Sequence, residues 1–144
     1  MKNLAIILTL LASCLLTGCG NEADELSGRS FNLIYPTTLP SGQSNHQGLT
    51  VLTFKEGTVE TPYMKDAEGK YALEEDELKV VFQEDSQKLN IIFEDFDAST
   101  KNYSTYSAII EQAELKTSSD QKARGLSKLK QIFKVDFPVE FLER

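Results

Sequence analysis

Short runs in which apolar and polar residues alternate dominate the middle of the chain, from Phe31 to Phe93. A period of two is typical of β-strands that bury one face, because successive side chains of a strand point to opposite sides. Polar clusters separate the runs, and the two longest, at 36–48 and 95–102, predict loops. The alternating runs predict strands at 30–35, 49–54, 58–60, 70–73, 77–83 and 88–93.

The segment 103–116 allows two interpretations. Its middle, residues 108–115, reads AIIEQAEL and contains good helix formers. Aromatic and β-branched residues, Tyr103, Thr105 and Tyr106, precede its two isoleucines and favour a strand. We prefer the strand, which would end the run of hairpins, and the helix stays open at this point.

A helical period begins only after this segment. Ser118 and Gln121 have the spacing of a capping box at the start of a helix. Apolar residues then recur every three or four positions, which predicts an amphipathic helix that packs on the rest of the domain. These residues are Ala123, Leu126, Leu129, Ile132 and Phe133.

The last residues return to a period of two. Val135, Phe137, Val139 and Phe141 occupy every second position, which predicts a final strand over 135–142 with these four on one face. Pro138 has no N–H to donate to a neighbouring strand, so this strand is expected at a sheet edge.

Together these elements predict a mainly β domain of about seven or eight short strands with one C-terminal helix. No helix separates the early strands, which excludes parallel βαβ units. A run of hairpins leaves two open edges unless the sheet closes on itself. The expected fold is therefore a small antiparallel meander barrel.

An apolar segment, Leu4 to Leu16, opens the chain after the basic Lys2. A helix over this segment rises only about 20 Å, at about 1.5 Å per residue, whereas the hydrocarbon core of a bilayer is about 30 Å thick. The segment is therefore typical of the apolar region of a secretory signal peptide.

The four residues Leu16-Thr17-Gly18-Cys19 follow and resemble the lipobox of bacterial lipoproteins. The resemblance implies that the Cys19 thiol receives a diacylglycerol and that the precursor is cut between Gly18 and Cys19. It also implies a chain held to the cell membrane by its acyl chains and facing outside the cytoplasm. Leu11-Ala12-Ser13-Cys14 fits a relaxed form of the motif, but Cys19 is preferred because a polar stretch follows it.

These motifs divide the chain into a signal peptide at 1–18, a lipidated tether at 19–25 and a single domain at 26–144. Cys14 would leave with the signal peptide, and Cys19 would carry lipid. The domain would then have no disulfide and no thiolate metal site.

Three segments of the domain resemble the small lipocalin-like, or calycin-like, barrels of bacterial exported proteins. They are Leu26–Phe31, Leu52–Thr58 and Gly69–Leu78. Such barrels often open with Gly-x-Trp and continue with a Thr-Phe-x-x-Gly hairpin. This chain contains no Trp, so Phe31 would stand in the position of the tryptophan at the barrel floor. The resemblance implies a binding barrel and transfers no binding residue.

The chain carries a net charge of −7, which argues against a nucleic-acid partner. His46, the only histidine, lies in a predicted polar loop, and no Gly-x-Ser-x-Gly elbow is present. The residues Asp95, Asp97 and Ser99 alternate as in a calcium loop, but the required sixth and twelfth positions hold Thr100 and Tyr106. No catalytic residue, metal site or cofactor is therefore predicted.

The predicted function is binding without catalysis, either of a small apolar molecule inside the barrel or of a surface component. The alternative is an envelope protein–protein interaction, for example an inhibitor or immunity module. Glycosidase chemistry stays open because two carboxylates suffice for it. An empty barrel interior would favour the small molecule, and a filled interior with exposed apolar residues would favour the protein interaction.

Overall fold

The computed structural model describes residues 24–38, 44–65, 67–117 and 124–144. The elements are β1 (Ser30–Thr38), β2 (Ser44–Lys55), β3 (Thr58–Glu60), β4 (Glu68–Glu74), β5 (Glu77–Glu84), β6 (Gln87–Ala98), β7 (Tyr106–Thr117), α2 (Arg124–Ile132) and β8 (Pro138–Glu143). In the described part of the chain, no helix is both long and apolar enough to cross a bilayer.

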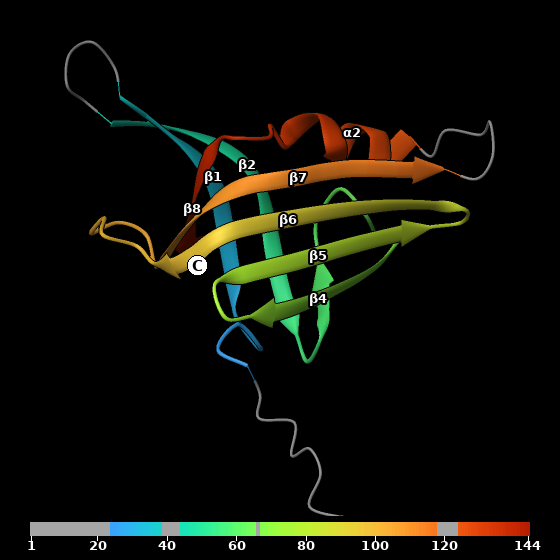
Figure 1. Cartoon of the computed structure of the whole chain (residues 1–144), viewed down its shortest axis with the longest axis horizontal. Helices are drawn as coiled ribbons and strands as arrows, with labels where there is room; N and C mark the ends of the chain where they lie inside the picture. The colour runs from blue at the N-terminus through green and yellow to red at the C-terminus, as the bar shows by residue number, and fades with distance from the viewer. Residues whose placement is uncertain (1–23, 39–43, 66, 118–123) are drawn as a thin grey trace, which may run out of the picture.

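The eight strands form one closed antiparallel barrel (Figure 1). Each strand pairs with the next along the chain, and β8 pairs with both β7 and β1 to close the sheet. This confirms the predicted meander barrel with one helix near the C-terminus. The segment 108–115 lies within β7, so the strand interpretation of this segment is correct.

The bounds of two predicted loops are wrong. Within 36–48, β1 continues to Thr38 and β2 begins at Ser44, so that Pro36 pairs with His46. Within 95–102, β6 continues to Ala98 past a bulge, where Asp95 has a positive φ of 51°. In both places pairing with a neighbouring strand stabilises a polar stretch whose composition suggests a loop, and the bulge absorbs the extra residues of β6.

The prediction that Pro138 marks an edge strand is also wrong, because β8 has neighbours on both sides. Pro138 is the first residue of β8, a position where a strand tolerates a missing N–H. The strand therefore starts three residues later than expected, and only Val139 and Phe141 of its predicted apolar face are buried.

The seam between β3 and β4 is the weakest in the barrel. Strand β3 has three residues and pairs with β4 only through Thr58 and Lys70. The strands approach closely at Gly69, where an added Cβ would lie 2.0 Å from the carbonyl oxygen of Val59 and 2.8 Å from the Phe82 ring. Any side chain here would clash with the backbone of β3, so glycine is required where β4 passes close to it.

The N-terminal end of the barrel is closed by the turn at residues 24–29. The Tyr71 hydroxyl donates to the Asp24 carboxylate at 2.8 Å, and burial together with this carboxylate raises the pKa of Tyr71 to about 12. Arg29 donates two hydrogen bonds of 2.7 Å to Glu143, which lowers the pKa of that carboxyl. The Arg29 guanidinium also lies 5.0 Å from the centre of the Phe31 ring. Asp24, in the predicted tether, is thus bound to the barrel.

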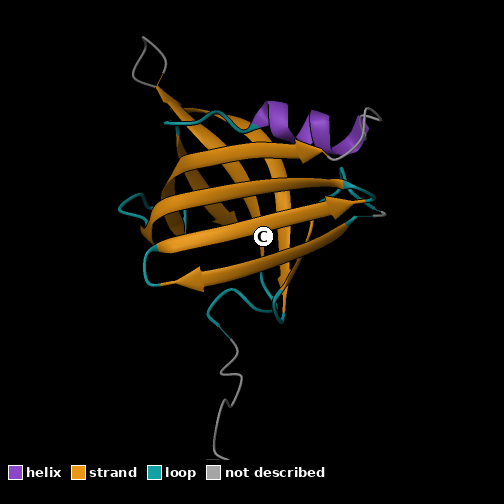
Figure 2. Cartoon of the chain, turned by 45° about the vertical axis from the view of Figure 1, so that its right-hand side comes forward, coloured by secondary structure: helices purple, strands orange, loops and turns teal. Residues whose placement is uncertain are grey.

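The opposite end of the barrel is covered by α2 (Figure 2). Leu126, Leu129 and Phe133 are buried against β6 and β7, as the helical pattern predicts. The Tyr35 hydroxyl donates to the carbonyl of Ile132 and accepts from the N–H of Lys134, both at 2.7 Å, which holds the C-terminal end of the helix. The predicted capping residues Ser118 and Gln121 lie outside the described residues.

Candidate functional site

The interior of the barrel is packed with aromatic rings. Five phenylalanines are at most 1% exposed; they are Phe31, Phe54, Phe82, Phe93 and Phe141. The Phe141 ring makes edge contacts with Phe31, Phe93 and Phe96 at centroid distances of 5.2–6.1 Å. Phe31 is fully buried beside Arg29, at the N-terminal end of the barrel. These side chains fill the space in which a small apolar molecule would have to bind.

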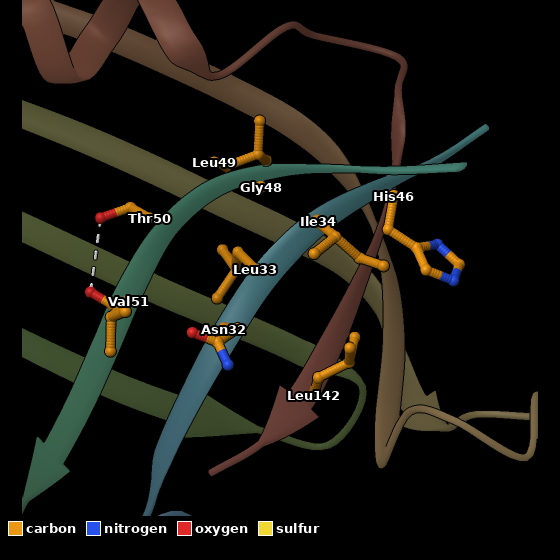
Figure 3. A pocket seen from close by; sticks show the side chains of 9 residues that line it. All are labelled: Asn32, Leu33, Ile34, His46, Gly48, Leu49, Thr50, Val51 and Leu142. Atoms are coloured by element: carbon orange, nitrogen blue, oxygen red, sulfur yellow. Dashed lines mark hydrogen bonds between the residues drawn. The ribbon is translucent and has the colours of Figure 1, made fainter. Parts of the chain in front are cut away.

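A shallow groove lies instead on the outer face, over β1, β2 and β8 (Figure 3). It has a volume of about 410 Å³, and Ile34, Val51 and Leu142 contribute apolar groups to it. His46 is exposed and projects at one side of the groove (Figure 3); it comes from β2 and not from the loop that the sequence predicts. The groove is open to solvent, so it suits contact with a surface better than enclosure of a small molecule.

A buried carboxylate, Glu140, lies on the same outer side of β8. Its neighbours Val139 and Phe141 point into the barrel, so Glu140 points outward. It is nevertheless only 4% exposed, because the loop between β6 and β7 folds over it. The Ser99 and Ser104 hydroxyls both donate to its Oε2 atom, the former at 2.7 Å.

Tyr103, in the same loop, connects this carboxylate to the groove. Burial raises the pKa of the Tyr103 phenol, and the negative charge of Glu140 adds to the effect. The Tyr103 ring lies against His46, with 4.5 Å between the ring centres. The loop therefore fixes a compact polar cluster beside the groove, composed of Ser99, Tyr103, Ser104 and Glu140.

Replacing Glu140 by alanine is expected to lower the free energy of unfolding by about 2–3 kcal/mol, since two hydroxyls lose a charged acceptor. Glu140→Gln keeps the size of the side chain and should cost less. Denaturant unfolding measures both. The matched control is Glu60→Ala, because Glu60 is an exposed strand residue paired with Lys55; its loss should be about 0.5 kcal/mol or less. Equal losses for Glu140→Ala and the control would contradict this account.

The other candidate residues do not converge on a site. Asp95 lies in the bulge of β6 and Asp97 directly after it, and no group of three or more His, Cys, Asp or Glu side chains within the described ranges could hold a metal ion. Cys19 and Gly18 lie outside the described residues, so lipidation and cleavage there stay predictions. One Glu84 oxygen is buried near α2 without a hydrogen-bond partner among the described residues.

Two features of the outer surface escape the sequence pattern. Val135 and Phe137 are 45% and 47% exposed, although the alternation predicts that they face the core with Val139. Glu140 is buried, although it is charged and faces outward. The exposure of Val135 and Phe137 depends on where β8 begins, and the burial of Glu140 depends on how the loop at 99–105 folds back. Neither can be predicted from the alternation of neighbouring residues.

Comparison with known proteins adds no relative: no family model matches the chain, and no significant match was found to a curated protein or a solved structure.

Proposed function

We propose that this chain is an exported lipoprotein, held to the cell membrane by lipid on Cys19, whose barrel binds another envelope component through its outer surface. The filled barrel interior is the observation that carries this proposal. It favours the protein interaction over the small apolar ligand, because pockets that enclose a small molecule measure roughly 300–1,000 Å³. The packed phenylalanine rings occupy that space.

Exposed apolar side chains support the same conclusion. Tyr63, Val135 and Phe137 are each about half exposed, and the outer groove adds the partly exposed Val51 and Leu142. Aromatic residues at the surface are typical of protein interfaces, where they supply much of the binding energy. We further propose that the domain acts by binding and turns over no substrate.

Native mass spectrometry of the full lipidated chain, purified in mild detergent from the membranes of its own host, tests this proposal. We expect a second envelope protein to be retained in a fixed ratio. A small apolar molecule that stays bound after every protein partner has dissociated would contradict the outer-surface proposal. Hydrolysis of a cell-wall glycan that is lost on replacing one carboxylate would contradict the non-enzymatic part.

A further inference from the structure

The charges of the barrel are distributed unevenly between its two ends. Exposed acidic residues gather at the N-terminal end, on the turn at 24–29, on the β2–β3 and β4–β5 turns and near the C-terminus; they are Glu25, Glu56, Glu75, Asp76 and Glu143. Arg29 and Lys55 at this end are already paired with Glu143 and Glu60. The N-terminal end therefore presents a mainly negative surface.

The helix α2, which covers the other end, has the opposite character. No acidic residue occurs in α2, and the side chains of Lys128, Lys130 and Lys134 are exposed on or just beyond it. Asp136 follows in a turn with a φ of 64°, and exposed acids also lie on the neighbouring elements, Asp85 in the β5–β6 turn and Glu111 and Glu114 on β7, where Glu114 is paired with Lys116. In a chain of net charge −7, α2 is therefore a basic helix.

An exposed aromatic residue is held rigidly beside these lysines. The Phe137 ring packs edge-on against Tyr35 at a centroid distance of 5.7 Å, and Lys134 Nζ lies 5.5 Å from the centre of the Phe137 ring. Tyr35 is itself fixed by its two hydrogen bonds at the end of α2. A side chain that is already ordered loses little entropy on binding, which favours Phe137 as an anchor in an interface.

We propose that this end of the barrel is a docking surface for an acidic segment of another envelope protein. The surface, here called the α2 docking face, consists of Lys128, Lys130, Lys134, Val135 and Phe137. The inference rests on the proposed function and adds the place and the chemistry of the partner. Complementary charge steers such a partner to the lysines, and an apolar side chain of the partner covers Phe137 and Val135.

The chemistry of the face favours a protein over a polyanionic polymer. A chain of phosphates would match the lysines but has no apolar group to cover Phe137 and Val135, which are about half exposed. The position of the face also suits an external partner. Residues 19–24 span at most about 18 Å when fully extended, so the proposed lipid on Cys19 lies nearest the N-terminal end. The α2 docking face is at the other end (Figure 1).

The test is site-specific photo-crosslinking in the host, with the full-length chain carrying a benzoyl-phenylalanine at position 137. Matched probes replace Lys55 and Asp76, which are exposed at the N-terminal end. We expect a protein adduct from position 137, with the crosslinked peptide of the partner rich in Asp and Glu, and little adduct from the other two positions.

Charge variants complete the experiment. Reversal in Lys128→Glu, Lys130→Glu and Lys134→Glu together should reduce the adduct about tenfold, since each exposed charge contact contributes modestly. The same three positions changed to Arg should keep the adduct within about twofold. Thermal melts of both triple variants establish that the barrel is folded, which is expected because all three side chains are exposed.

Each other outcome has a definite meaning. A lipid or glycan adduct at position 137, or an adduct that charge reversal leaves unchanged, overturns the docking inference. Protein adducts from position 55 or 76 but not 137 overturn it while leaving the proposed function intact. Absence of a protein adduct at all three positions counts against both.

Discussion

Replacing Phe93 by alanine is expected to lower the free energy of unfolding by about 3–5 kcal/mol, the usual cost of removing a buried phenyl ring. Phe93 has no exposed surface, and its ring contacts Phe133 from beyond α2 and Phe141 from β8. The substitution removes transfer free energy and leaves a cavity that its rigid neighbours fill only in part. Denaturant unfolding measures the loss from the midpoint and the slope.

A matched control uses the same substitution on the surface. Phe137→Ala should cost about 1 kcal/mol or less, because Phe137 is 47% exposed and its main packing partner is Tyr35. The Phe93→Ala variant should also gain a dry apolar cavity, so saturating benzene should raise its melting temperature while leaving the parent unchanged. Equal losses for the two variants would contradict a filled interior.

Replacing Cys19 by alanine is expected to abolish lipid attachment and to leave the uncut precursor. The proposed lipid is attached through the thiol, and alanine offers no group to accept it. Two acyl chains anchor a protein firmly because each buried CH₂ contributes about 0.8 kcal/mol. Metabolic labelling with a radioactive or alkyne-tagged fatty acid, followed by gel separation, measures both attachment and cleavage.

Cys14→Ala is the control that separates the two candidate cysteines. Labelling and cleavage should be normal in that variant if Cys19 is the lipidated residue. Normal labelling of Cys19→Ala together with loss of labelling in Cys14→Ala would move the site to Cys14. Absence of labelling and of cleavage in the parent chain would remove the lipoprotein assignment from the proposed function.

The fold class follows from the sequence because the barrel imposes a local period. Along β5, Leu78, Val80 and Phe82 are buried at every second position, as their alternation predicts. The ends of strands do not carry that signal. At Pro36 and Asp97, loop-forming residues join a sheet because the next strand supplies their partners, His46 and Ser107, which lie across a hairpin, ten residues further along the chain.

The candidate sites are less predictable than the fold for the same reason. The burial of Glu140 requires that Ser99 and Ser104 fold back from a loop more than thirty residues earlier. Phe137 is exposed because β8 begins at Pro138, so that Phe137 lies just before the strand and does not join its core face. A pattern within a few neighbouring residues contains neither fact, although the Pro at position 138 indicates that the strand is interrupted there.

The short contact between β3 and β4 has a consequence for how the barrel opens. One residue pair joins β3 to β4, so thermal fluctuations that open the sheet should begin at this seam, and amide protons beside Gly69 should exchange with solvent ahead of those in β6. Each opening exposes two strand edges that could pair with another molecule. Charged side chains at Glu60, Glu68 and Lys70 are exposed along those edges. Such charges disfavour pairing of the open edge with a strand of a second chain. The seam where the barrel opens most easily is therefore also protected from edge-to-edge aggregation.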